Sequence, residues 1–252
     1  MTRKEAFIKL QTSKELYVLM SPCTKLPFVV CDEETADDQI FIYEKTEDIE
    51  REAKHFIEKK QPVQFMKIEN KGFLGFYSNL FTMGVNCIVL NGFTDNEYRV
   101  QIAELVKRPG SNQPDKSPWI ENPALHLTAI YFMQEVRRQK LTELPDACKE
   151  MMEEVLRNFE KGSFIVVYKE KEGAPLLKLP NGDVYQPIFT DLIEFQKFNK
   201  NQQFKAVGTS AQGLLKMLAK EAKGFVINPM GVNFQIPIKR EVVDADGNEK
   251  DS

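Results

Sequence analysis

An α+β (mixed α/β) fold made of two repeated modules is predicted by three observations along this chain of 252 residues. The stretches 16–92 and 163–231 run through the same order of expected elements: three strands, a helix, a strand, a helix and a strand. Each copy opens with an apolar strand, and each closes on a buried strand that stops at an asparagine, Asn91 or Asn228. Short loops favour an antiparallel meander at the start, and the helix–strand alternation favours right-handed crossovers. We therefore expect a mixed sheet of about five strands with two helices in each module.

Apolar periodicity places the elements of the first module. The opening strand (16–20) is followed by a proline-marked strand (26–30) and by a third strand that ends at Tyr43. Thr46 is expected to cap the next helix, whose apolar residues recur at helical spacing. The remaining elements are a strand over 63–68, a strongly apolar helix over 73–83 ended by Gly84, a strand over 87–90, and an alternating strand over 97–106.

The second module repeats this order with different residues. Its strands are expected over 164–168 and 174–178, and its third strand ends at Phe189. Asp191 and Glu194 have the spacing of a capping box, at the start of a helix that is expected to bury Leu192, Phe195 and Phe198. The order closes with a strand over 204–207, an apolar helix around Leu214 and Leu215, a strand over 225–228 and an alternating strand over 232–238.

Composition shifts predict four segments. The first module covers residues 1–107, and residues 108–162 form a loop and a two-helix spacer that packs the two copies against each other or decorates the first. The second module covers 163–240, and the polar segment 241–252 is expected to be a flexible tail. We expect each module to have its own sheet-and-helix interior.

Charge and apolar runs exclude several classes of protein. A formal net charge of −3, with Lys and Arg interspersed among Asp and Glu, supplies no basic surface for a nucleic-acid backbone. A membrane span needs roughly twenty apolar residues, and the longest apolar runs here are about five residues, with no signal-peptide pattern at the N-terminus. We therefore expect a cytoplasmic protein with no nucleic-acid or membrane partner.

Cysteines and histidines indicate neither a metal nor a redox site. Four cysteines show no CxxC pair, and Cys87 and Cys148 lie at expected buried positions, so we expect reduced, structural thiols. The two histidines, His55 and His126, fall on separate helices without a ligand-spaced cysteine. His126 is interpreted as a surface or capping histidine. No cofactor or metal is predicted.

The later part of the second module resembles a known family. Residues 186–195, the helix with Leu214 and Leu215, and the segment 224–231 resemble the SseB family (enhanced serine sensitivity protein B), in its N-terminal domain. The first copy is similar more loosely, with Tyr43 in place of the phenylalanine and Asn91-Gly92 in place of asparagine–proline. The resemblance implies two SseB-like modules in a bacterial protein, and it brings no assigned reaction.

The turns after the closing strands are candidate ligand sites. In open sheets with crossover helices, ligands bind beyond the carboxyl ends of strands. Asn228, Pro229 and Gly231 stand there in the second module, and Asn91 stands there in the first. The alternative is a plain turn, in which the asparagine caps the strand, proline fixes the turn and Gly231 takes a positive φ.

The apolar helix of the first module is a candidate partner surface. Its apolar stripe consists of Phe73, Phe76, Tyr77, Leu80 and Phe81, and Leu74 and Met83 widen it beyond what one sheet face needs. Two interpretations remain open: packing between the two copies, or an interface with a protein partner or a second copy of the chain.

Catalytic motifs are not apparent in the sequence. No serine stands in a glycine-flanked elbow, and the glycines lack the spacing of a phosphate-binding loop. No catalytic residue is predicted. The hypothesis is therefore a non-enzymatic binding or protein-interaction protein, and the alternative is a small-molecule binding or catalytic domain with a pocket near 228–231.

Overall fold

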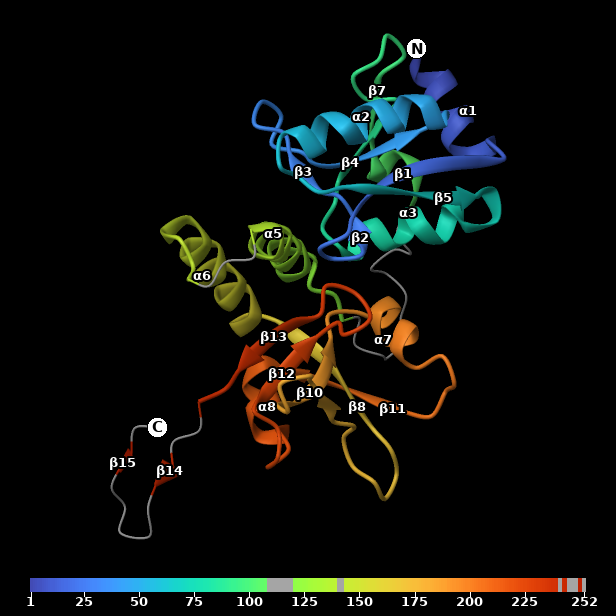
Figure 1. Cartoon of the computed structure of the whole chain (residues 1–252). Helices are drawn as coiled ribbons and strands as arrows, with labels where there is room; N and C mark the ends of the chain where they lie inside the picture. Colours follow the sequence, from blue (N-terminus) through green and yellow to red (C-terminus); the bar gives the residue numbers. More distant parts are fainter. Residues whose placement is uncertain (108–119, 140–142, 240–241, 244–248, 251–252) are drawn as a thin grey trace.

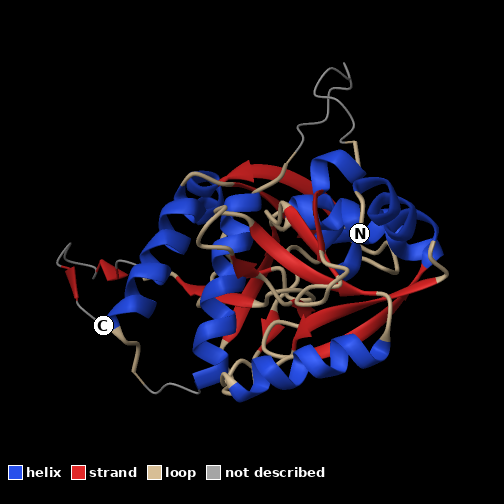
Figure 2. Cartoon of the chain, turned by 90° about the horizontal axis from the view of Figure 1, so that it is seen from above, coloured by secondary structure: helices blue, strands red, loops and turns tan. Residues whose placement is uncertain are grey.

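Two separate sheets, one in each half of the chain, form the framework of the computed structural model (Figure 1). The structure describes residues 1–107, 120–139, 143–239, 242–243 and 249–250, so most of the loop after the first module and part of the expected tail lie outside the described residues. Between the two sheets lies a pair of long helices, α5 (Pro123–Gln139) and α6 (Asp146–Glu160). Seen from above, helices surround the strands (Figure 2).

The first sheet has seven strands, in the order β2-β1-β4-β6-β7, with β5 also paired to β1 and β3 to β4. Its strands are β1 (Glu15–Ser21), β2 (Leu26–Pro27), β3 (Val30–Cys31), β4 (Asp38–Tyr43), β5 (Gln64–Glu69), β6 (Cys87–Leu90) and β7 (Tyr98–Gln101). Its helices are α1 (Arg3–Thr12), α2 (Thr46–Glu58), the short 3-10 helix η1 (Asn70–Gly72), α3 (Phe73–Thr82) and α4 (Ile102–Leu105).

The second sheet has six strands, in the order β11-β8-β10-β12-β13, with β9 paired to β10. Its strands are β8 (Ser163–Tyr168), β9 (Leu177–Lys178), β10 (Val184–Phe189), β11 (Lys205–Ser210), β12 (Gly224–Ile227) and β13 (Phe234–Pro237). Its helices are α7 (Leu192–Phe198) and α8 (Ala211–Met217), and a two-stranded ribbon of β14 (Val242–Val243) and β15 (Glu249–Lys250) follows.

The two sheets share a path of five strands, whereas β2 of the first sheet has no counterpart in the described second sheet. In the first, β5, β1, β4, β6 and β7 pair in this order, and β11, β8, β10, β12 and β13 do the same in the second. The central pairs, β4 with β6 and β10 with β12, are parallel, and the flanking pairs are antiparallel. Ile42 faces Val18 across one sheet, as Ile188 faces Val166 across the other. The mixed α+β fold with two repeated sheets is thus confirmed.

The interior does not divide into two as we expected. One apolar cluster extends from a face of the first sheet, around Leu16 and Ile40, through the spacer helices to the second sheet. Phe132 of α5 contacts Phe234 of β13 edge-on, with ring centroids 5.7 Å apart. Smaller clusters lie under α2 and α7, on the other face of each sheet. One face of each sheet packs against helices of its own module. The other face belongs to the common core, because the two amphipathic spacer helices need apolar partners on both sides.

Several local predictions were wrong. The strand expected over 26–30 is divided into β2, which pairs with β1, and β3, which pairs with β4. The strand expected over 97–106 ends at Gln101, and the helix α4 follows it. Leu192 is half exposed rather than buried, while Phe195 is buried. The cap of α2 is Lys45, one residue before Thr46, and it makes no side-chain capping hydrogen bond.

The helix α1 had no apolar repeat by which it could be predicted, since only Ala6 and Leu10 are buried on it. A capping box holds its start: Thr2 accepts a hydrogen bond from the Glu5 N–H, and the Glu5 carboxylate accepts one from the Thr2 N–H.

The cysteines are free, and Cys87 and Cys148 are buried as expected. Within the described part of the chain, no helix combines the length and the apolar character needed to cross a membrane.

Candidate functional site

The two asparagines that end the closing strands occupy equivalent positions. Asn91 and Asn228 both adopt left-handed backbone conformations, with φ of 51° and 47°. The N–H of Asn91 donates to the carbonyl of Ile42 at 2.7 Å, and the N–H of Asn228 donates to that of Ile188 at 3.0 Å. Asparagine tolerates this conformation better than other side chains do. Both residues therefore add one backbone hydrogen bond to a parallel strand pair, and the chain turns back after them.

Their side chains also bind the same neighbour in each module. The Asn91 side-chain oxygen accepts from the Glu44 N–H at 3.0 Å, and its Nδ2 donates to Glu44 Oε2 at 2.8 Å. The Asn228 side-chain oxygen accepts from the Thr190 N–H at 3.0 Å, and its Nδ2 donates to Thr190 Oγ1 at 2.8 Å. The asparagine amide thus joins the ends of the two central strands in both modules.

Counting outward from these strands gives a set of paired positions around each strand end. They are Glu44 with Thr190, Lys45 with Asp191, Asp48 with Glu194, Arg51 with Lys197, Tyr43 with Phe189, Glu52 with Phe198, Phe93 with Met230 and Thr94 with Gly231. The pairing holds in detail: an ion pair joins Arg51 to Asp48 one turn along α2, and another joins Lys197 to Glu194 one turn along α7.

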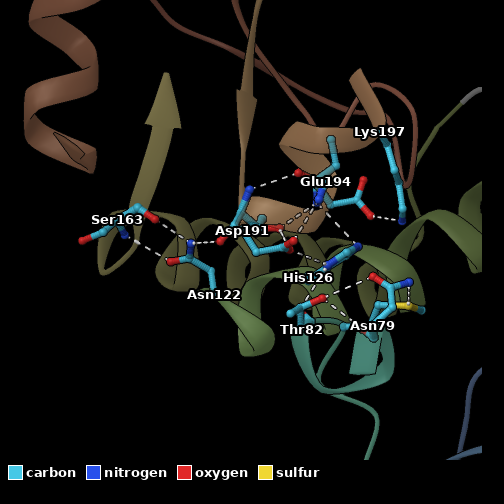
Figure 3. A network of polar contacts seen from close by, with 11 residues as sticks. Asn79, Thr82, Asn122, His126, Ser163, Asp191, Glu194 and Lys197 are labelled. Carbon is cyan, nitrogen blue, oxygen red and sulfur yellow. Dashed lines mark hydrogen bonds and ion pairs between the residues drawn. The ribbon is translucent and has the colours of Figure 1, made fainter. Parts of the chain in front are cut away.

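In the second module this strand end is closed by His126 from the spacer helix α5 (Figure 3). The ring is fully buried. Its Nδ1 lies 3.3 Å from the carbonyl oxygen of Thr82 in the first module and 3.8 Å from Asp191 Oδ2 in the second. Its Nε2 lies 3.5 Å from Asn228 Nδ2. His126 therefore connects both modules; of its interpretation as a surface or capping histidine, the surface alternative was wrong, whereas its Nδ1 does lie at the carbonyl that ends α3.

The buried carboxylates of the second module have partners of their own. Asp191 accepts from the Glu194 N–H at 2.9 Å, which caps α7, and it accepts from the Thr190 hydroxyl at 2.7 Å. Glu194 is fully buried: its Oε1 pairs with Lys197, whereas its Oε2 has no hydrogen-bond partner among the described residues. Among the described residues, no group of three or more histidine, cysteine or acidic side chains is placed to hold a metal ion. The cluster is a network of polar contacts that locks the modules together.

Burial sets the protonation state of His126. It lowers the pKa of the imidazole, and the nearby carboxylates of Glu194 and Asp191 act in the opposite direction. Since the ring is fully enclosed, we infer that burial prevails and that the neutral form is favoured.

The predicted ligand residues of the second module are covered. Asn228 and Gly231 are buried, and Pro229 is half buried. Gly231 does not take the positive φ we expected. Glycine is needed there for space, since a Cβ atom would lie 2.5 Å from Glu194 Oε2. With Asn228 bound to Thr190 and His126, its amide has no access to a ligand.

The same strand end is open in the first module, where Asn91 was also predicted as a ligand residue. A cleft of about 480 Å³ lies beyond β4 and β6. Its lining combines cationic, anionic and amide side chains with one aromatic ring: Lys9, Glu44, Lys45, Asp48, Arg51, Asn91, Phe93, Thr94, Asp95 and Asn96. Asn91 is therefore the predicted ligand residue that the structure places at a cavity.

Two ion pairs balance most of the charge in the cleft. Lys9 Nζ lies 2.5 Å from Glu44 Oε2, and Arg51 lies 3.1 Å from Asp48. Lys45 is exposed at the start of α2, and no ion pair engages it within the described chain. Its counterpart in the second module is the anionic cap Asp191, so the charge at this position is reversed between the modules.

Phe93 stands at the cleft in a strained conformation. Its φ is +59°, which is a costly value for a bulky side chain. Its ring stacks on Phe41 with centroids 5.7 Å apart, yet 60% of the residue is exposed. An exposed aromatic ring on a strained turn is a feature that recurs at binding sites.

Beneath the helix that borders the cleft lie two buried polar groups. The Tyr43 hydroxyl and Glu52 Oε1 are buried, and neither has a hydrogen-bond partner among the described residues. Burial raises the pKa of both groups. Their counterparts, Phe189 and Phe198, instead pack ring to ring at 5.3 Å. Buried polar atoms without partners are rare in stable folds, so this polarity needs a reason.

The predicted partner surface is mostly interior. Phe73, Tyr77 and Leu80 are buried in the large core, and Phe76 is half buried against it. Three of these four side chains are thus unavailable to a partner. Core packing, the other interpretation of this stripe, agrees with their burial. The exposed apolar residue of α3 is Leu74.

Several cleft residues were missed by sequence reasoning. Lys45, Asp48, Arg51 and Phe93 stand in no recognised motif. Aligning the two repeats position by position would have shown Lys45 opposite Asp191, which is a signal of divergence at an equivalent site.

Comparison with known proteins adds little to this picture. No protein family and no curated protein matches the sequence. Tic22 from Plasmodium falciparum is 12% identical over 88% of this chain and 90% of its own, with a TM-score of 0.25. Anabaena Tic22, a protein of protein transport, is 9% identical over 86% of each chain, with a TM-score of 0.22. Likeness at this level carries no argument, and the resemblance to the SseB family stays a prediction.

Proposed function

We propose that this protein binds a small polar ligand in the cleft of the first module, and that the second module is a closed structural counterpart. One observation carries the proposal: positions that the second module seals with His126 line an open cavity of about 480 Å³ in the first. Ligand sites are typically concave, with a few polar groups and an apolar contact. The ion pairs, the Lys45 ammonium group and the Phe93 ring supply these features.

A thermal-shift screen against amino acids, organic acids, sugars, nucleosides and amines tests this function. At a concentration a hundred times its Kd, a ligand should stabilise the protein by about 2.7 kcal/mol. The variant Lys45→Glu should lose most of this stabilisation. The variant Lys54→Glu is the matched control, since it makes the same charge change at an exposed position of α2 outside the cleft.

Two outcomes count against the proposal. Either no compound in these classes stabilises the protein, or the stabilisation is the same in Lys45→Glu as in the wild type.

A second candidate function is interaction with a protein partner or with another copy of the chain. Equivalent apolar side chains are exposed in both modules, Leu74 on α3 and Leu215 on α8. Analytical ultracentrifugation of the double variant Leu74→Glu, Leu215→Glu tests self-association. A mass equal to that of the wild type would remove these residues from any such interface.

The cytoplasm of a bacterium is the setting we propose for either function. The resemblance to the SseB family and the absence of any disulfide among the four cysteines support it. Fractionation of the native host is the direct test.

A further inference from the structure

In the second module, a carboxylate of the protein itself occupies the end of the two central strands. The carboxylate of Asp191 lies at the N-terminus of α7 and accepts the Glu194 N–H. A helix N-terminus carries partial positive charge and unpaired N–H groups, so a carboxylate there is stabilising. In the second module the protein supplies that carboxylate itself.

The first module lacks this group and carries the opposite charge. Lys45 replaces the aspartate at the cap of α2, a helix of 13 residues, and no side chain caps it. The ammonium group of Lys45 and the helix dipole both favour an anion at the same place. The cleft opens at this point, because Lys45, Asp48 and Asn91 all line it.

The remaining charges limit which anion fits. Glu44 and Asp48 are neutralised by Lys9 and Arg51. Asp95 is exposed at the cleft without an ion pair in the described part of the chain. Three carboxylates so close to the site would repel a doubly charged phosphate more than a singly charged group.

One hydroxyl of the first module is buried under the helix that borders the cleft. The Tyr43 hydroxyl is fully buried and has no hydrogen-bond partner among the described residues. The second module, whose strand end is closed, has phenylalanine there. Retaining an unpaired hydroxyl has a cost in stability, as do the buried atoms Gln186 Nε2 and Glu194 Oε2 of the second module, which are unpaired within the described chain.

We propose that the ligand is a monocarboxylate with an apolar or aromatic part, whose carboxylate caps α2 beside Lys45 and whose apolar part lies against Phe93. This inference rests on the proposed function and adds the ligand's chemical class. The carboxylate would take the place that Asp191 holds in α7. The exposed Phe93 ring would supply the apolar contact.

The test is an amide NMR titration of the ¹⁵N-labelled full chain at constant ionic strength. The probes are benzoate, its neutral isostere benzamide, and inorganic phosphate. Benzoate should give saturable shifts at the amides of residues 46–48 and of Phe93, and benzamide and phosphate should bind at least about tenfold more weakly.

Two variants sharpen the titration. Lys45→Asp copies the second module, so it should cap α2, raise Tm by about 2–4 °C and abolish the benzoate shifts. Lys54→Asp makes the same change outside the cleft and should leave the benzoate shifts intact.

Three results would overturn the carboxylate inference: equal binding of benzamide and benzoate, tighter binding of phosphate, or benzoate shifts that survive Lys45→Asp. A neutral or cationic compound that emerges from the thermal-shift screen and depends on Lys45 would preserve the proposed function while refuting this ligand class. Failure of both experiments would refute both proposals.

Discussion

The two strand ends of this protein share a backbone and differ in chemistry. In both, an asparagine in a left-handed conformation joins two parallel strands and binds the residue that follows the third strand of the repeat. In the second module, His126 and a self-capped helix fill the space. In the first, a cationic cap residue and a polar cleft stand there.

The two strand ends also differ in how their buried polar groups are paired. Buried polar networks with all members paired make a structure rigid, whereas unpaired polar groups lower stability. The second module has the Asp191 and His126 network and a phenylalanine pair. The first retains Tyr43 and Glu52 without full pairing. The second module is not fully paired either, since Gln186 Nε2 and Glu194 Oε2 are buried without a hydrogen-bond partner among the described residues.

Removing the imidazole that closes the second strand end should have the largest effect. His126→Ala leaves a buried void and takes a partner from Asp191 and Asn228. We expect a loss of about 2–4 kcal/mol in the free energy of unfolding, measured by urea denaturation. His55→Ala, at an exposed position, should change it by less than about 0.5 kcal/mol. Equal losses in the two variants would mean that His126 does not lock the modules.

The free energy of unfolding should decrease as the pH falls below about 6.5. Because burial lowers the pKa of His126, the unfolded chain binds a proton at higher pH than the folded chain does. The stabilisation is therefore complete above the unfolded pKa of about 6.5 and is lost as the pH falls through that value toward the folded pKa. The slope of unfolding free energy below pH 6.5 should reach at most about 1.4 kcal/mol per pH unit.

The measurement is a comparison of the wild type with His126→Gln between about pH 7 and 5. The variant should show the smaller slope. Glu52, whose pKa is raised by burial, acts in the opposite direction at lower pH, so the difference between the proteins is the informative quantity. Parallel profiles would show that His126 titrates no differently in the folded state.

Alanine substitutions at the equivalent positions 231 and 94 should destabilise the closed turn more than the open one. Gly231→Ala places a Cβ against the buried Glu194 carboxylate, and we expect a loss of about 1–3 kcal/mol. Thr94→Ala, at the equivalent position, removes a partly buried hydrogen bond to the Asn91 carbonyl and should lose about 0.5–1 kcal/mol. Thermal denaturation measures both. The reverse order of effects would contradict the close packing of the second turn.

The smallest effect concerns the unpaired hydroxyl of the first module. Tyr43→Phe copies the residue of the second module and should be neutral or stabilising by up to about 1 kcal/mol. Tyr77→Phe is its control, because the Tyr77 hydroxyl donates to the Leu10 carbonyl at 2.8 Å, and its loss should destabilise by about 1 kcal/mol. If both changes destabilise equally, Tyr43 has a partner, such as a bound water, in solution.

The sequence by itself determined the repeat and its sheets. Apolar runs of period two, the asparagines after β6 and β12, and Gly84 with its φ of +81° follow from local preferences. The strand over 97–106 was wrong because its alternation continues by chance into the helix α4. Asn91 was also recognised as a candidate, since its place depends only on the end of a strand.

Only the tertiary structure decided which strand end is open. Whether a polar side chain is buried depends on segments distant in the chain, as when α5 carries His126 into the second module and leaves the equivalent position of the first uncovered. Lys45 and Asp191 stand at the caps of the equivalent helices α2 and α7. The consequence of their opposite charges depends on whether the neighbouring space is open or filled by other segments of the chain. Local patterns specify backbone conformation, whereas burial and charge pairing arise from long-range contacts that no window of sequence contains.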